Sequence, residues 1–373
     1  MRTQPLPREP NPHLQPPFLT LNSSSWLWLC LLGAAAILSG ACTSHTRTPM
    51  NSAAIVAVVP AAGQAPDPAF QYPKTEISFK NHTVGQGATP KYSEREISIP
   101  SVGVSPQGDR VVTGRYFRSV EPGPHPLVIV LPIYARFTYP SEKVGTFVQR
   151  HSDGEFHVLE VEGKNFLINW YSAADTDNEE QFVDLFRQGA EAERIVITDL
   201  RRLIDWAGQQ PEIDGDRVAV VGFSRSAIVA GTLATQEPRL AATVLVVGGA
   251  HPHTIIARCG GKRTSAVQRN AKRQFGWDQD ELEKRLEPIF KLVDAANYPG
   301  RVDPNTVLMI EAAKDSCITE PSRTELWEAM GQPEQISLNY GHRKAFLSMT
   351  PVGGNWMCER IYEFLEERLL GGS

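Results

Sequence analysis

A pentapeptide with a serine at its centre joins a strand pattern to a helix pattern in this chain. It reads Gly222-Phe223-Ser224-Arg225-Ser226, with the β-branched run 217–221 before it and the small, apolar run 227–231 after it. A serine at the apex of such a turn is held with its hydroxyl exposed above a sheet, where a histidine can take its proton. The pattern predicts a nucleophile at Ser224. The alternative is an ordinary strand–turn–helix corner in which the serine only caps the helix.

Helix and strand patterns alternate along the segments around the pentapeptide. A helical pattern covers 192–209, and a turn at 211–216 leads into the strand. In this order the chain resembles the α/β-hydrolase superfamily, whose nucleophile elbow reads G-x-S-x-G. Ser226 stands where that motif has its second glycine. Serine is the next smallest residue with a polar atom, so the departure is mild.

An acid and a histidine follow the serine in the order that the resemblance implies. Asp315 comes just after the strand pattern 306–310, and His342 follows the strand pattern 335–340. Because ligand groups collect at the carboxyl ends of parallel strands, both side chains are expected at the edge that carries Ser224. The hypothesis is that Ser224 attacks an acyl carbon, His342 acts as general base and then acid, and Asp315 orients the imidazole.

Other acids and histidines fit these roles less well. Asp303 belongs at the opposite end of its strand, and Glu311 lies on the strand itself. His251 and His253 precede Asp315, which breaks the family order, so they are expected in the pocket wall. The histidines before the elbow are read as linker, loop or surface groups.

Two backbone donors are expected to form an oxyanion hole. One is the N–H of Arg225, directly after the nucleophile. The other should follow the strand pattern 126–131, where related hydrolases carry His-Gly-x. Pro132 and Ile133 stand on the His-Gly pair, which assigns the donor to Tyr134 and leaves Ile133 as a second candidate.

The side chain of Arg225 is a further candidate for substrate contact. Its place resembles the G-x-S-R elbow of glucuronoyl esterases, which implies a guanidinium that stabilises an oxyanion or binds a carboxylate on the substrate. The alternative is a surface arginine on the first turn of a helix.

Composition excludes some classes of partner. The 373 residues are 41% apolar and 21% charged, with a net charge of −5, as in an ordinary globular protein. This charge argues against nucleic-acid binding. The sequence has no Cys/His spacing typical of a metal site and no phosphate-binding glycine loop, so neither a cofactor nor a metal is predicted.

The first part of the chain predicts export. An apolar run at 26–38 is too short to span a bilayer comfortably and ends in Ser39-Gly40-Ala41-Cys42. Small residues before a cysteine resemble the bacterial lipobox, which implies a signal peptide at 1–41 and lipidation of Cys42. The leader is long and Ser39 replaces the usual aliphatic residue. A lipoprotein of the outer membrane or periplasmic face is expected; a secreted protein and an uncleaved anchor are the alternatives.

The rest of the chain divides into a tether and one domain. Residues 42–72 are rich in Thr, Ser, Ala and Pro, as in a flexible tether. Residues 73–373 alternate strand and helix patterns, which predicts an α/β fold with a mostly parallel central sheet and helices on both faces. A helical pattern at 280–296 predicts a small helical cap insertion at about 252–303.

Three cysteines remain if Cys42 is lipidated and Cys30 is removed with the signal peptide. They are Cys259, Cys317 and Cys358, an odd number that permits one disulfide and one free thiol. Cys259 and Cys317 both follow strands that should end at the active-site edge, so a bridge between them is one alternative. The sequence does not decide the pairing.

Residues 95–370 look like the dienelactone-hydrolase and acyl-ester-hydrolase branch of the superfamily. The resemblance implies a serine esterase that cleaves a small-molecule carboxylic ester through an acyl-enzyme intermediate. A serine peptidase of the same fold is one alternative, and a catalytically inert surface-binding module is another. The intact set of Ser224, Asp315 and His342 argues against the inert module. The oligomeric state stays open.

Overall fold

The computed structural model describes residues 45–50, 65–73, 80–105, 108–133, 139–163 and 170–371. These residues fall in one compact unit, Thr43–Ser373. The predicted signal peptide at 1–41, the lipidation site Cys42 and the oxyanion-hole candidate Tyr134 lie outside the described residues. Among the residues that are described, no helix combines the length and the apolar character needed to cross a bilayer.

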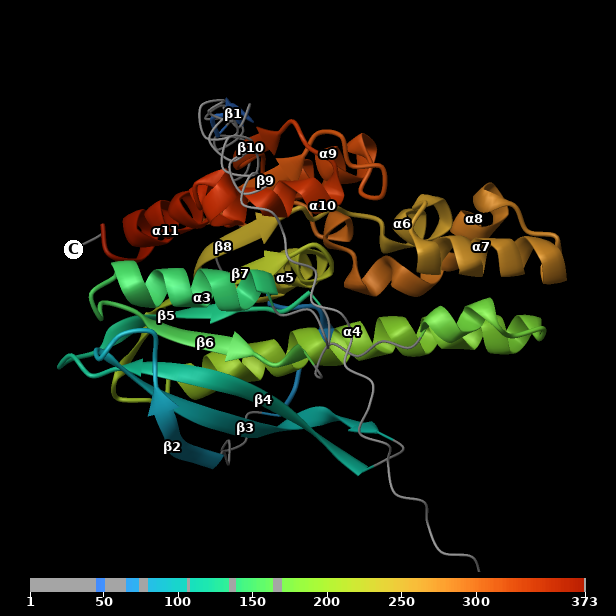
Figure 1. Cartoon of the computed structure of the whole chain (residues 1–373). Coiled ribbons are helices and arrows are strands. Elements are labelled where there is room, and N and C mark those ends of the chain that lie inside the picture. The colour runs from blue at the N-terminus through green and yellow to red at the C-terminus, as the bar shows by residue number, and fades with distance from the viewer. Residues whose placement is uncertain are drawn as a thin grey trace, which may run out of the picture. The chain divides into compact units, whose positions relative to one another are not determined.

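A ten-stranded sheet forms the centre of the described fold, in the order β1-β10-β9-β8-β7-β5-β6-β4-β3-β2 (Figure 1). The six strands from β10 to β6 run parallel, and the strands at both sides of them pair antiparallel. The strands are β1 His45–Thr48, β2 Lys80–Gln86, β3 Tyr92–Ser105, β4 Gly108–Ser119, β5 His125–Val130, β6 His157–Val161, β7 Ile213–Phe223, β8 Leu240–Val246, β9 Val307–Ala312 and β10 Glu334–Leu338.

Helices cover both faces of this sheet, as predicted. The helices are α3 Tyr139–His151, α4 Glu179–Ala207, α5 Arg225–Gln236, α6 Pro252–Arg258, α7 Lys262–Phe275, α8 Gln279–Phe290, α9 Glu320–Ala329, α10 His342–Ala345 and α11 Trp356–Leu369. Short 3₁₀ helices lie between them: η1 Pro68–Phe70, η3 Trp170–Ala174, η4 Lys291–Val293, η5 Ala295–Asn297, η6 Pro304–Thr306, η7 Phe346–Met349 and η8 Pro351–Gly353. The core of one face includes α4 and α5, and the core of the other includes α3 and α11.

The central strand β7 explains why the sequence around 217–221 reads as a continuous apolar run. Val218 and Val220 belong to the core on the α4 and α5 side, whereas Ala219, Val221 and Phe223 belong to the core on the α3 and α11 side. Successive side chains of a strand point to opposite faces, and both faces are covered here. The alternation of polar and apolar residues is therefore lost.

Helix α4 begins earlier than the helical pattern at 192–209 predicts. It starts at Glu179, after Asn178, whose side chain accepts a hydrogen bond from the N–H of Gln181 at 2.8 Å. Phe182 and Phe186 are fully buried one helical turn apart. The first turns also carry several charged or polar residues, Glu179, Glu180, Gln181, Asp184 and Arg187, and the predicted helix at 192–209 does not include them.

Helices α6, α7 and α8 lie between β8 and β9, within the predicted range 252–303. In Figure 1 they form the orange group beyond the ends of the strands, and α8 contacts both α6 and α4. That these helices act as a cap over a pocket stays a prediction.

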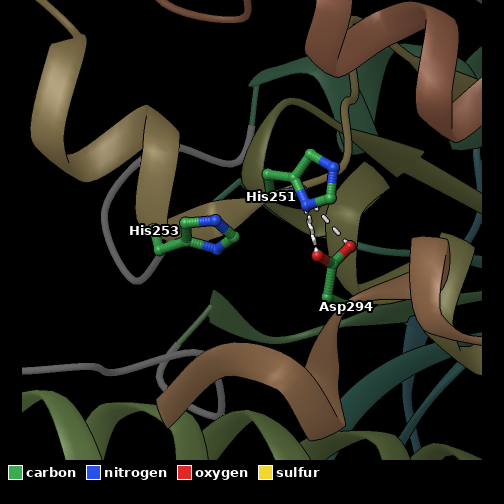
Figure 2. A group of neighbouring side chains, drawn as sticks. All are labelled: His251, His253 and Asp294. Carbon is green, nitrogen blue, oxygen red and sulfur yellow. Dashed lines mark hydrogen bonds and ion pairs between the residues drawn. The ribbon is translucent and has the colours of Figure 1, made fainter. Parts of the chain in front are cut away.

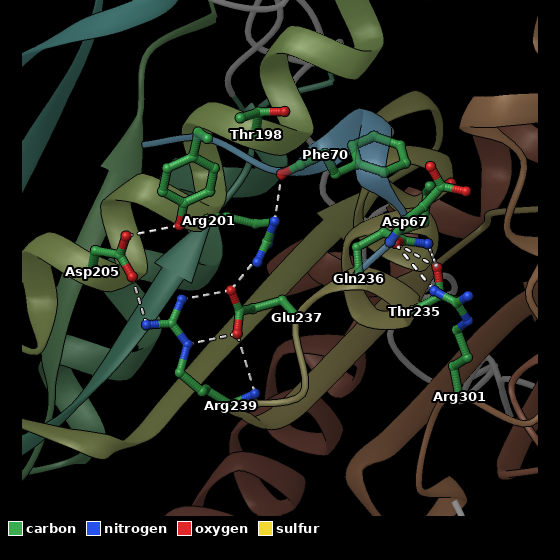
Figure 3. A network of polar contacts seen from close by, with 12 residues as sticks. Asp67, Phe70, Thr198, Arg201, Asp205, Thr235, Gln236, Glu237, Arg239 and Arg301 are labelled. Atoms are coloured by element: carbon green, nitrogen blue, oxygen red, sulfur yellow. Dashed lines mark hydrogen bonds and ion pairs between the residues drawn. The ribbon is translucent and has the colours of Figure 1, made fainter. Parts of the chain in front are cut away.

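A polar network fastens the α5–β8 loop at the end of the sheet away from Ser224 (Figure 3). Arg239 donates to Glu237 at 2.7 Å and to Asp205 of α4 at 2.6 Å. Asp205 also accepts from the hydroxyl of Tyr72 at 2.8 Å, and Arg201 pairs with Glu237 at 3.3 Å. The network thus connects α4, the loop and the segment around η1.

His157 of β6 is not the surface group that the sequence reading made it. It is fully buried. Its Nδ1 accepts from the N–H of Ser119 at 2.9 Å, which leaves Nε2 as the donor to the carbonyl of Glu212 at 2.8 Å. Burial lowers the pKa of His157 to about 4, so the ring is neutral at pH 7 and belongs to the structure of the sheet.

Candidate active site

Ser224 occupies the turn between β7 and α5 in a strained backbone conformation. Its φ is 52° and its ψ is −113°, a region that residues other than glycine rarely adopt. The N–H of Ser224 donates to the carbonyl of Val246 in β8 at 2.8 Å, which ties the turn to the neighbouring strand. Strain of this kind is common where a side chain must be presented to a substrate.

The residues on both sides of Ser224 show why small side chains are needed here. A Cβ on Gly222 would lie 2.8 Å from the carbonyl carbon of Ser226, too close for any other residue without a backbone shift. Ser226 itself is fully buried, and its hydroxyl accepts from the N–H of Phe223 at 2.8 Å. The hydroxyl therefore has a partner inside the turn, which explains how serine replaces the second glycine of the motif.

Ser224, His342 and Asp315 form a row of hydrogen bonds. The Oγ of Ser224 lies 2.9 Å from Nε2 of His342. The Nδ1 of His342 lies 2.6 Å from Oδ2 of Asp315. With Nδ1 protonated, it donates to the carboxylate and leaves Nε2 to accept from the serine. The structure thus brings together the three side chains that the sequence predicted at one edge of the sheet.

Backbone donors fix the carboxylate of Asp315. Its Oδ1 accepts from the N–H groups of Cys317 at 2.8 Å and Ile318 at 3.1 Å. Burial opposes the ionisation of this carboxyl, but the hydrogen bonds from His342 and from these two N–H groups outweigh it and hold the pKa of Asp315 below its usual range. A carboxylate that is charged near neutral pH can stabilise an imidazolium.

The parallel order of the strands explains why these residues meet. Neighbours β7, β8, β9 and β10 are all parallel, so the loops that follow them lie at one edge. The loop after β9 carries Asp315, and His342 is the first residue of α10, directly after the turn that follows β10. The loop and the turn are joined directly, because the N–H of Lys314 donates to the carbonyl of Tyr340 at 2.9 Å.

Of the oxyanion-hole candidates, Arg225 and Ile133 are described. Arg225 is the first residue of α5 and follows Ser224 directly. Ile133 is buried just beyond the end of β5, the strand that pairs with β7. Tyr134 lies in the range 134–138, outside the described residues. The assignment of the second donor stays a prediction.

The side chain of Arg225 is not a surface group. It is 18% exposed and its Nη2 lies 3.3 Å from Oε1 of Glu193 in α4. Glu193 is buried; burial raises the pKa of Glu193, and the charge of Arg225 acts against that rise. The guanidinium predicted beside the nucleophile is therefore paired with a carboxylate of the protein. The sequence reading missed Glu193, whose helical spacing alone does not distinguish it from a solvent-facing acid.

A cavity of about 190 Å³ opens beside Ser224 and His342. Many of its lining side chains are apolar, and the Arg225–Glu193 pair adds a carboxylate and a guanidinium to the wall. Its lining residues are Trp170, Tyr171, Glu193, Ser224, Arg225, Ile228, Pro252, Ile255, Ile256, Cys259, Thr264, Phe290, Cys317, Ile318 and His342. His251 and His253 line a different cavity, so the expectation that they form the wall of this pocket is wrong.

Cys259 and Cys317 form a disulfide in the wall of this cavity. The bridge connects the end of α6 to the loop that carries Asp315. Cys358 of α11 is a free, buried thiol, and burial raises its pKa to about 12. The structure thereby decides the pairing that the sequence left open.

Comparison with known proteins places this geometry in a known architecture. The structure is similar to that of acetyl xylan esterase 1 from Thermoanaerobacterium sp. JW/SL YS485, with 15% identity and a TM-score of 0.54 over 78% of this chain and 89% of the other. An acetyl xylan esterase from Paenibacillus sp. R4 is similar at 14% identity and a TM-score of 0.55, over 78% and 89% of the two chains. The chain has the α/β-hydrolase fold. At these identities the likeness concerns the fold.

The sequence comparisons are more limited. Residues 201–321 match the family described as BAAT / Acyl-CoA thioester hydrolase C terminal. This match includes Ser224 and Asp315 but ends before His342. The search of curated protein sequences gives no match.

Proposed function

We propose that this α/β-hydrolase chain is a serine hydrolase that cleaves a carboxylic ester through an acyl-enzyme intermediate. The observation that carries the proposal is the hydrogen-bonded row from Ser224 Oγ through His342 to Asp315, at 2.9 and 2.6 Å. Nε2 of His342 takes the serine proton as Oγ attacks the acyl carbon, and Asp315 stabilises the imidazolium that forms. The imidazolium then protonates the departing alcohol, and a water molecule, activated by the same histidine, releases the acid.

The oxyanion of the tetrahedral intermediate needs donors opposite the attacking hydroxyl. In this proposal the N–H of Arg225 supplies one of them and the residue at 133 or 134 supplies the other. Arg225 also opens α5, whose amino-terminal end favours negative charge.

The small volume of the cavity favours a short acyl group. About 190 Å³ accommodates an acetyl or butyryl group better than a long chain, and apolar walls suit an uncharged acyl part. Two similar structures are acetyl xylan esterases by name, which supports the same preference.

A thioester is the second candidate substrate class. The family matched by residues 201–321 is described as an acyl-CoA thioester hydrolase C terminal. The same serine chemistry cleaves thioesters, since only the leaving group differs.

The test compares the wild-type chain with Ser224→Ala and with Ser337→Ala, a control in β10. Hydrolysis of p-nitrophenyl acetate, p-nitrophenyl butyrate, acetyl-CoA and a peptide p-nitroanilide is measured for each. We expect Ser224→Ala to lower kcat for the preferred substrate by about 10⁴–10⁶-fold, and the control to match wild type. A fluorophosphonate probe should label the peptide that contains Ser224. Unchanged hydrolysis by Ser224→Ala would refute the mechanism, and a wild-type chain inert toward all four substrates would favour a binding module.

We also propose that the chain is an exported lipoprotein of the bacterial envelope, anchored through Cys42. The support is the lipobox-like sequence at 39–42. In cells fed an alkyne fatty acid, the wild-type chain should carry the label and fractionate with membranes, and Cys42→Ser should do neither. A labelled Cys42→Ser chain would contradict the anchor, and an unlabelled, soluble wild-type chain would favour secretion.

A further inference from the structure

His251, His253 and Asp294 form a cluster of neighbouring side chains (Figure 2), and neither histidine lines the cavity of Ser224. His251 lies in the loop after β8, His253 in the first turn of α6, and Asp294 between η4 and η5. One potential ligand atom from each of the three lies within 4.8 Å of those of the other two. Residues from three separate segments thus converge on one point.

The imidazole of His253 lacks a partner that its burial requires. The residue is only 8% exposed, and its Nδ1 is buried without a hydrogen-bond partner in the described part of the chain. Buried polar atoms are nearly always paired, so an unpaired one calls for an explanation. In Figure 2 the ring of His253 extends toward His251 and Asp294. A ligand between these side chains would engage the ring.

The other two side chains of the cluster are already held in place. Asp294 is buried, and its carboxylate accepts from the N–H groups of His251 and Ala296, each at 3.2 Å. Nδ1 of His251 lies 2.9 Å from Oδ2 of Asp294, and its Nε2 is hydrogen-bonded to Glu325. A metal-ligating histidine usually donates one ring N–H to a carboxylate while its other nitrogen binds the ion. Here Nε2 of His251 would donate to Glu325, which leaves Nδ1, beside Asp294, for the ion.

We propose that His251, His253 and Asp294 bind one divalent transition-metal ion, with Zn²⁺ as the best match, and that Glu325 orients His251. Two imidazole nitrogens and one carboxylate oxygen suit Zn²⁺, whereas Mg²⁺ and Ca²⁺ prefer oxygen ligands alone. Bonds of about 2.1 Å in a tetrahedral site place neighbouring ligand atoms about 3.4 Å apart. To reach this spacing, Nδ1 of His251 and Oδ2 of Asp294 would move slightly apart from 2.9 Å, and the remaining ligand atoms, which lie within 4.8 Å of one another, need only small shifts.

A cavity of about 740 Å³ provides the route to this site. His251 and His253 line it together with Glu325. The four carboxylates of its wall, Asp280, Glu283, Glu287 and Glu325, outnumber the two cationic side chains, Arg258 and Lys284. This balance attracts a cation, and the open side leaves a coordination position for water or another ligand.

The ion would tie the helical insertion to the sheet. It would join the loop after β8 to α6 and to the segment that follows α8. Ile255 and Ile256 of α6 and Phe290 of α8 line the cavity of Ser224. The bound ion should therefore raise the unfolding temperature of the chain. It should also reduce the motion of the α6 and α8 side of the Ser224 cavity, without contacting Ser224.

The test measures metal binding itself. The full-length chain, purified without a polyhistidine tag and stripped with a chelator, is titrated with Zn²⁺ in a calorimeter and, separately, with Co²⁺ in a spectrophotometer. We expect one saturable ion per chain, visible ligand-field bands with Co²⁺, a higher unfolding temperature with Zn²⁺, and no binding of Mg²⁺.

The variants separate this site from other histidines. His253→Gln and Asp294→Asn should weaken Zn²⁺ binding at least 100-fold, and Glu325→Gln about 10- to 100-fold. His82→Gln, which changes an exposed histidine, should bind as wild type does. His253→Gln changes a buried residue. If the His253→Gln chain fails to fold, the Zn²⁺ affinity of Glu325→Gln is the deciding measurement. The absence of saturable Zn²⁺ binding by the wild-type chain, or wild-type affinity in a folded His253→Gln or Glu325→Gln, overturns the proposal.

Discussion

The disulfide between Cys259 and Cys317 should stabilise the folded chain by about 4 kcal/mol. The two cysteines are 58 residues apart, and closing a loop of that length removes about 14 cal/mol/K of entropy from the unfolded chain. The perturbation is the double variant Cys259→Ala with Cys317→Ala. For a folded body of about 300 residues, the unfolding entropy is about 0.6 kcal/mol/K, so the loss corresponds to a decrease in Tm of about 7 °C.

The same bridge should also affect the chemistry, because it holds the loop of the catalytic acid. The N–H of Cys317 donates to Asp315 at 2.8 Å, and both cysteines line the cavity beside Ser224. A looser loop would let the carboxylate leave its position behind the imidazole. We expect kcat to fall at least tenfold in the double variant.

The assay is urea unfolding monitored through tryptophan fluorescence, carried out with and without a reducing agent. Cys358→Ala is the control, since it removes a buried thiol that closes no loop and should cost on the order of 1 kcal/mol. The reducing agent should destabilise the wild-type chain and Cys358→Ala but leave the double variant unchanged. A difference below about 1 kcal/mol between wild type and double variant, or an equal response of both to the reducing agent, refutes the loop-closure reasoning.

Three further changes test the site and its support. Asp315→Asn should lower kcat by about 10⁴-fold, because the tautomer of His342 is then no longer fixed; steady-state ester hydrolysis that falls less than tenfold would contradict this role. The pKa of His157 is about 4 in the folded chain and about 6.5 in the unfolded chain, so the neutral ring stabilises the fold by about 3 kcal/mol above pH 6.5, and this stabilisation is lost as the pH falls toward 4. In urea unfolding across this range, the free energy of unfolding should depend less steeply on pH in His157→Gln than in wild type. Equal pH dependence in the two would count against this role. Gly222→Ala should lower kcat/KM at least 100-fold, since its Cβ meets the backbone of Ser226; wild-type hydrolysis by that variant would show that the turn tolerates the methyl group.

The elbow and its two partners were predictable because local patterns and strand order determine them. The residues of the Ser224 turn are consecutive. The turn needs small residues on both sides of the serine for steric reasons, and this requirement holds in any sheet of this kind. Asp315 and His342 are distant in sequence, but each directly follows a strand pattern. Parallel strands place such loops at one edge, so the chain order was enough to bring the residues together.

The interactions that sequence reasoning missed depend on which helix lies across from which strand. The early start of α4 was missed because the buried Phe182 and Phe186 stand in a segment that also carries exposed charged and polar residues such as Glu180 and Arg187. His157 was misread because a histidine in an apolar run has no signal that distinguishes a buried, neutral ring from an exposed one. Its partners come from elsewhere in the chain, Ser119 from the end of β4 and Glu212 from the turn before β7.

The Arg225–Glu193 pair shows how such a missed contact changes the reading of the site. From the sequence, the guanidinium beside the nucleophile had two possible roles toward a substrate, each requiring an available positive charge. Glu193 comes from α4 and lies against Arg225 at 3.3 Å, in the wall of the same cavity. A substrate carboxylate would have to displace a carboxylate that is already desolvated, and that displacement would leave a buried acid without its partner. The pair places opposite charges together in the cavity wall beside Ser224, so under the proposed function we expect an uncharged ester to be hydrolysed in preference to a uronate.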